Sequence, residues 1–156
     1  MSRSKLSTSL PARLLSLLLV AAILVVGVKV FTTAHAATQR TWTGNNPPAT
    51  LNNAGNWAGS VAPVAGDDLF FPAGVKRRSI RNNYPNDTSF NSLSFSGSDY
   101  NLRKNSLTLT AGINTSNPTG SNQVSVPIRL DGSQTFQSAN TGTTLILNGH
   151  INLDGN

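Results

Sequence analysis

Two amino acids are missing from the sequence, which contains no cysteine and no glutamate. Without cysteine, disulfide bonds, thiolate zinc sites and cysteine nucleophiles are excluded. Charged residues account for only 12% of the chain, and runs of Ala, Glu, Lys and Leu, the usual material of surface helices, do not occur after residue 36. These absences argue against a helical domain and against thiol chemistry.

The chain is rich in Asn, Ser, Thr and Gly, which are typical of turns and short strands. Leu, Ile, Val and Phe recur between them, which argues against a disordered chain. The formal net charge is +6, but four of the basic residues precede residue 36 and no acid does. The remainder carries eight basic residues against six Asp, so its bulk charge does not indicate a nucleic-acid binder.

The first 36 residues have the order of a secretory signal peptide. A basic start is followed by the apolar run Leu14–Val28, and Ala34 and Ala36 have the spacing that a signal peptidase requires. We therefore predict a helical signal peptide over residues 1–36, cleavage after Ala36, and a secreted or cell-surface protein that meets the membrane only through this leader. The alternative is an uncleaved anchor, although this run of 15 residues is shorter than the ~20 apolar residues that span a bilayer.

In the C-terminal half, short segments at 106–110 and 123–130 alternate apolar and polar residues, and 144–147 contains a third apolar run. Such alternation indicates strands with one buried face. Apolar residues also recur 19 positions apart, which predicts stacked β-helix turns with two interior columns, Leu107/Val126/Leu145 and Leu109/Ile128/Leu147. Continued 19 residues towards the N-terminus, the two columns fall on Thr88 and Phe90. Only Phe90 is apolar, so we expect a register shift there.

Two features keep an ordinary β-sandwich open as the alternative. Its strands also recur at short intervals, and Pro127 is awkward inside a stacked strand. In either case the chain divides into the leader, a segment 37–66 rich in Asn, Pro and Gly, and the strand-forming segment 67–156. We expect the middle segment to form a loop-rich N-terminal cap.

Several motifs appear in a distinctive order: Trp42-Thr-Gly44, Gly55-Asn-Trp57, Ala62–Pro72, Ser89–Gly97 and Leu107–Asn114. In that order the chain resembles bacterial proteins with autotransporter-associated β-strand repeats. The resemblance covers about residues 41–154. It implies a right-handed parallel β-helical passenger at the cell surface, with no cofactor and no catalytic residues.

Members of that family are usually longer than this chain, which stops at Asn156. We therefore expect a fragment whose last strands, 144–147 and 151–153, leave an unpaired edge. Such an edge is a template for another strand, so edge-to-edge self-association is a further expectation.

Acidic and histidine residues offer little for catalysis or metal binding. Asp67 and Asp68 are adjacent, so on a strand their carboxylates point to opposite faces. We interpret Asp67 as a turn acid, with a calcium ligand as the alternative. His150, the one histidine after the leader, has no nucleophile motif around it and is expected to be an exposed turn residue.

Two groups of residues are candidates for contact with a glycan or an anion. Lys76, Arg77, Arg78 and Arg81 form the one basic cluster, interpreted either as an anion site or as a solvated loop. Trp42 and Trp57 either stack on sugars or close the apolar end of the first β-helix turn.

Three classes of function remain. The leading hypothesis is a non-catalytic structural or adhesive surface module. The alternatives are a carbohydrate-binding module, which uses the tryptophans and the basic cluster to contact polysaccharide, and a fragment of a polysaccharide-degrading β-helix. The scattered positions of the six Asp argue against the last.

Overall fold

The computed structural model describes residues 36–153, and the predicted signal peptide lies outside them except for Ala36. Two short 3₁₀ helices occur, η1 (Ala54–Asn56) and η2 (Ala58–Ser60). The other elements are strands: β1 (Gln39–Thr41), β2 (Asp68–Phe71), β3 (Ser79–Asn82), β4 (Thr88–Phe95), β5 (Asn101–Lys104), β6 (Leu107–Thr115), β7 (Gly120–Val124), β8 (Ile128–Leu130), β9 (Thr135–Ser138), β10 (Thr143–Leu147) and β11 (Ile151–Asn152).

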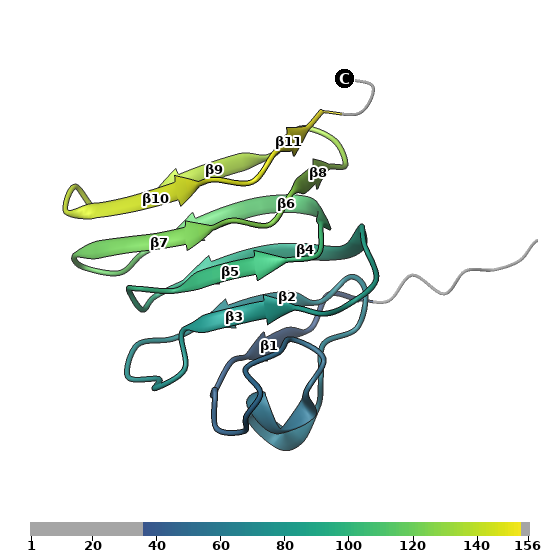
Figure 1. Ribbon diagram of the computed structural model, residues 1–156. Helices are drawn as coiled ribbons and strands as arrows, with labels where there is room; N and C mark the ends of the chain where they lie inside the picture. The colour runs from purple at the N-terminus through teal and green to yellow at the C-terminus, as the bar shows by residue number, and fades with distance from the viewer. Residues whose placement is uncertain (1–35, 154–156) are drawn as a thin grey trace, which may run out of the picture. The chain divides into compact units, whose positions relative to one another are not determined.

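The strands form a parallel β-solenoid. One sheet runs β1-β2-β4-β6-β8-β11 with β9 also on β6, and the second runs β3-β5-β7-β10. From β2 to β8 the chain alternates between the two sheets, and β8 and β9 then follow one another on β6. The stack rises turn by turn in the right-handed sense (Figure 1). Every strand pairing is parallel, as successive turns of a solenoid require and as an antiparallel sandwich does not allow. The predicted fold class is confirmed.

The alternating sequence pattern places one side chain inward and the next outward. Along β4, Leu93 and Phe95 are buried, whereas Ser92 and Ser94 are partly exposed. Parallel pairing stacks equivalent residues, so Phe71 on β2 lies over Phe95 with ring centroids 4.8 Å apart and planes 16° apart. These stacked columns of apolar side chains form the core between the two sheets.

The prediction of columns 19 residues apart is wrong for the last two turns. Leu107 pairs with Ile128, Leu109 pairs with Leu130, and Leu147 pairs with Val124. These partners are 21 or 23 positions apart. The turns between strands differ in length, so no single period in the sequence describes the stack.

In the preceding turn, the 19-residue step is correct at both positions. Thr88 lies in register with Leu107 and Phe90 with Leu109, and the register shifts only between Phe90 and Ser92. The register shift expected at Thr88 does not occur. A polar residue is tolerated in this column because Thr88 is the first residue of β4, where it is only partly buried.

Pro127 explains why the segment 123–130 is not one strand. Proline has no N–H to donate to a ladder, and the chain bends between Val124 and Ile128. The proline carbonyl still accepts a hydrogen bond from the Leu107 N–H, at 3.0 Å. The proline therefore lies at a turn between the two sheets, where its missing donor costs nothing.

The predicted cap segment contributes pairing to both sheets. β1 lies parallel to β2 and starts the larger sheet. Thr50 forms a parallel bridge with Arg81, and the Arg81 N–H donates to the Ala49 carbonyl at 3.0 Å, beneath β3. The segment 37–66 thus occupies the position of a first turn and covers the N-terminal end of the core.

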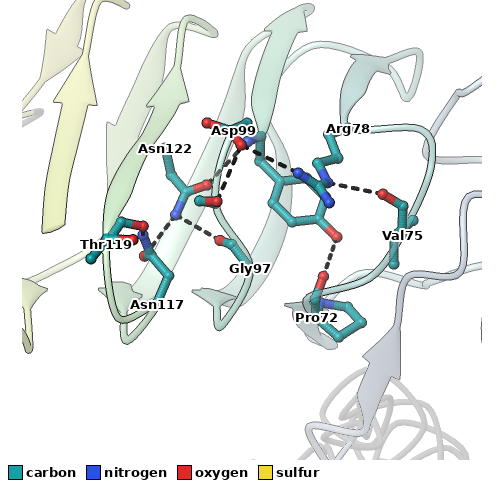
Figure 2. Close-up of polar contacts among 10 residues, drawn as sticks. Pro72, Val75, Arg78, Gly97, Asp99, Asn117, Thr119 and Asn122 are labelled. Atoms are coloured by element: carbon teal, nitrogen blue, oxygen red, sulfur yellow. Dashed lines mark hydrogen bonds and ion pairs between the residues drawn. The ribbon is translucent and has the colours of Figure 1, made fainter.

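A buried asparagine ties together the turn between β4 and β5 and the turn after β6. The Asn122 amide, which has no exposed surface, donates to the Gly97 carbonyl at 2.9 Å and to Asn117 Oδ1 at 3.0 Å (Figure 2). Its oxygen accepts from the Tyr100 N–H at 3.1 Å. One side chain thereby satisfies polar backbone groups that no strand ladder reaches.

Two other fully buried asparagines act in the same way elsewhere. On the opposite side of the stack, Asn82 donates to the carbonyls of Asn105 and Ser106 at 2.8 and 3.0 Å. In the cap, Asn56 donates to the Pro48 carbonyl at 2.9 Å. In each of these three regions a buried amide both donates and accepts hydrogen bonds.

Among the described residues, the last strands β9, β10 and β11 each pair with a neighbouring strand on one side only. Among the apolar side chains here, Ile146 is 36% and Leu153 is 59% exposed. Edge-to-edge self-association through this surface stays a prediction.

A glycine at a crowded stacking position tests the register. Gly112 has φ +97°, and a Cβ there would lie 2.1 Å from the Thr135 carbonyl oxygen on β9. We expect Gly112→Ala to cost about 3 kcal/mol or more of unfolding free energy, from the left-handed backbone and the clash together. Gly132→Ala is the matched control, because φ is +88° and the space is open, with an expected cost of ~1–2 kcal/mol. Equal costs in denaturant unfolding would contradict the stacking of β9 on β6.

Candidate functional site

The two tryptophans meet at the N-terminal end of the core. Trp42 follows β1 and Trp57 lies between η1 and η2, with ring centroids 5.1 Å apart in an edge-to-face arrangement. Trp42 Nε1 donates to the Arg77 carbonyl at 2.8 Å, and Trp57 Nε1 donates to the Leu51 carbonyl at 2.7 Å. Their relative exposures are 0% and 2%, so both indoles have their polar atoms satisfied inside the cap.

This burial corrects one of the two interpretations made from the sequence. A sugar stacks on an exposed ring face, and neither Trp42 nor Trp57 offers one. Both instead pack against Phe71, at 6.3 and 6.0 Å between ring centroids. The pair therefore closes the apolar end of the solenoid.

Two of the four residues in the basic cluster bind the backbone. Arg77 Nη1 donates to the Gly44 carbonyl at 2.7 Å, which fastens the loop before β3 to the cap. Arg78 Nε donates to the Val75 carbonyl at 2.9 Å, and its Nη1 forms an ion pair with Asp99 at 3.3 Å (Figure 2). The structure therefore does not present the cluster as one continuous patch.

The other two members, Lys76 and Arg81, are exposed. Arg81 lies on β3 in register with Arg103 on β5, which is also exposed. Like charges in neighbouring strands repel, so this pair of arginines, called the arginine ladder below, favours an anion over it. Arg103 was missed from the sequence because it lies 22 positions from Arg81, and only the correct register of the turns places the two together.

The Asp pair diverges, as predicted. Asp67 is fully buried and accepts from Arg40 Nε at 2.8 Å and from the Val64 N–H at 3.0 Å. Asp68 Oδ1 instead accepts from Asn91 Nδ2 at 2.8 Å and from the Ser92 hydroxyl at 2.5 Å. The interpretation of Asp67 as a turn acid is confirmed, with an ion pair added.

Histidine and carboxylate groups do not assemble into a metal site in the part of the chain that the structure describes, where no three of them come together. His150 is exposed in the turn before β11, as predicted. Asp68 lines a shallow groove of about 410 Å³ on the outer face of the larger sheet, with Phe70 and Ser94. The groove has no second carboxylate, since its other lining residues are Gln39, Leu69, Ser92, Asn114 and Ser116.

Both tyrosines of the sequence are held by backbone carbonyls. Tyr84 Oη donates to Pro63 and Tyr100 Oη donates to Pro72, each at 2.6 Å. Burial raises the pKa of both hydroxyls from 10.0 to about 12, and the charge of Asp67 adds to the increase in the pKa of Tyr84. These groups tie loops to the stack as neutral donors.

Comparison of the chain with protein-family models, with curated proteins and with solved structures finds no match. Between residues 36 and 153, no helix is long and apolar enough to cross a membrane.

The tyrosine pKa values predict a loss of stability in alkali. Because the folded pKa lies above the ordinary value, the contribution is complete below pH 10 and declines as the pH rises from 10 towards 12. Ultraviolet absorbance should show tyrosinate in the native protein only near pH 12, and near pH 10 in denaturant. A native titration with its midpoint at pH 10 would show that the hydroxyls are not held as described.

Proposed function

We propose that the chain is an exported, non-catalytic β-solenoid module with a structural or adhesive role at the bacterial surface. The observation that carries the proposal is the parallel stack itself, closed at its N-terminal end by the cap and with polar side chains on its outer faces. Backbone ladders between turns stiffen such a stack along its axis without disulfides. The predicted leader supplies the export route.

The arrangement of acidic groups supports the non-catalytic part of the proposal. Glycoside hydrolysis requires two carboxyl groups that converge on one bond. Asp67 is buried against Arg40, whereas Asp68 is bound by Asn91 and Ser92 on the outer surface. The Asp67 carboxylate therefore forms a buried ion pair, and the Asp68 carboxylate forms hydrogen bonds on the outer face of the sheet, so the two do not converge on one bond.

A second candidate function is polysaccharide binding through the arginine ladder. The specific observation is the register of Arg81 with Arg103, which places two exposed guanidinium groups on neighbouring strands. Guanidinium groups bind carboxylate and sulfate oxygens through paired hydrogen bonds. Binding of an acidic polysaccharide that is lost in the Arg81→Gln/Arg103→Gln variant, and kept in Arg81→Lys/Arg103→Lys, would favour this function.

Expression of the full chain in a bacterium tests the leading proposal. We expect mass spectrometry to find an N-terminus at Ala37 and protease treatment of intact cells or of the culture medium to release peptides from residues 37–153. A variant with Ala34→Arg and Ala36→Arg, which blocks the small pockets of the peptidase, should accumulate unprocessed. Retention of wild-type protein with Met1 in the cytoplasm would contradict the proposal.

A further inference from the structure

The turns that lead from the smaller sheet to the larger one lie one above another (Figure 1). Backbone hydrogen bonds join them in sequence. The Asp87 N–H donates to Ser106 at 3.2 Å, the Leu107 N–H to Pro127 at 3.0 Å, and the Ile128 N–H to His150 at 2.8 Å. A cavity of about 390 Å³, called the turn cavity below, extends along these four turns.

Basic side chains from three different turns line the turn cavity. Lys104 ends β5, Arg129 lies on β8 and His150 precedes β11, and all three are exposed. Asp87 is the one acidic residue among the described lining residues. The remaining polar lining consists of a hydroxyl and three amides, from Ser106, Asn86, Asn105 and Asn152.

The backbone at Lys104 gives this arrangement an unusual feature. Lys104 lies in register with Asn82, which is fully buried, yet Lys104 is exposed and has φ +98°. A left-handed backbone is unfavourable for lysine by roughly 1–2 kcal/mol. Residues held in such conformations concentrate at ligand-binding sites, and here the residue lines the turn cavity instead of entering the core.

We propose that the turn cavity binds the acidic groups of a polysaccharide whose chain runs along the stacked turns. Lysine and arginine side chains only donate hydrogen bonds, so their natural partners are anionic oxygens. Lys104 and Arg129 lie on successive turns of the stack, which suits a linear polymer with repeated acidic groups. The described lining contains no Phe, Tyr or Trp ring, the large aromatic surfaces on which nucleic-acid bases stack most strongly.

This site is separate from the arginine ladder and from the tryptophan cap, and it goes beyond the proposed structural role. It does not depend on export, because binding is measured on purified protein. The two functions therefore fail independently: a cytoplasmic chain that binds the polymer would contradict only the surface role.

The test uses the full chain, kept in solution by a mild non-ionic detergent, with dextran sulfate as the probe and neutral dextran as the polymer control. We expect dextran sulfate to bind, affinity to fall with salt, and Lys104→Gln/Arg129→Gln to weaken binding by about tenfold or more. Lys104→Gln and Lys76→Gln form a charge-matched pair, because each removes one exposed ammonium group and only Lys104 lines the turn cavity. The control Lys76→Gln should change affinity by less than about threefold.

A second variant separates binding from folding. Lys104→Gly removes the ammonium group and suits the positive φ, so it should keep the melting temperature or raise it while it weakens binding. Lys104→Arg should retain binding. Equal loss in Lys104→Gln and Lys76→Gln, loss confined to Arg81→Gln/Arg103→Gln, or no binding of dextran sulfate at low salt would each overturn the proposal.

Discussion

The stack depends on asparagine side chains that satisfy the backbone where the strand ladders stop. A parallel solenoid must turn between its sheets in every coil, and several turns bring carbonyls and N–H groups beside the core that no neighbouring strand reaches. Leaving such a group unpaired costs ~1–3 kcal/mol. Asn56, Asn82 and Asn122 are fully buried and bond to these groups in the cap and on the two sides of the stack. An amide suits this task because it both donates and accepts.

The N-terminal end of the core is closed in a different way. Apolar rings there must be shielded from water, whereas the polar groups of the turns need hydrogen-bond partners. Trp42 and Trp57 shield Phe71 and place their own N–H groups on backbone carbonyls. With both tryptophans committed to packing, contact with other molecules falls to the outer faces, the turns and the C-terminal edge strands. That division explains why charged candidates for binding lie on β3, β5 and the stacked turns, away from the tryptophans.

The sequence predicted the fold class because alternation of apolar and polar residues directly reflects inward and outward positions, as at Leu93 and Ser94. It did not predict the stacking period, because turn length varies and Pro127 breaks a segment that alternates like one strand. The same limitation concealed the candidate sites. Arg103 joins Arg81, and Lys104 joins Arg129 and His150, only when the register of the turns is known.

Disulfide mapping tests the stacking register most directly, since the sequence has no cysteine to interfere. Ser121 and Thr144 are paired on β7 and β10, and neighbouring Cα atoms in that geometry suit a disulfide. Ser125 and Thr144 are 19 positions apart, but Ser125 lies four residues further along, about 13 Å away. The account predicts rapid intramolecular oxidation of Ser121→Cys/Thr144→Cys and none of Ser125→Cys/Thr144→Cys. The opposite result would mean that the turns stack in the 19-residue register and that the turn cavity does not exist as described.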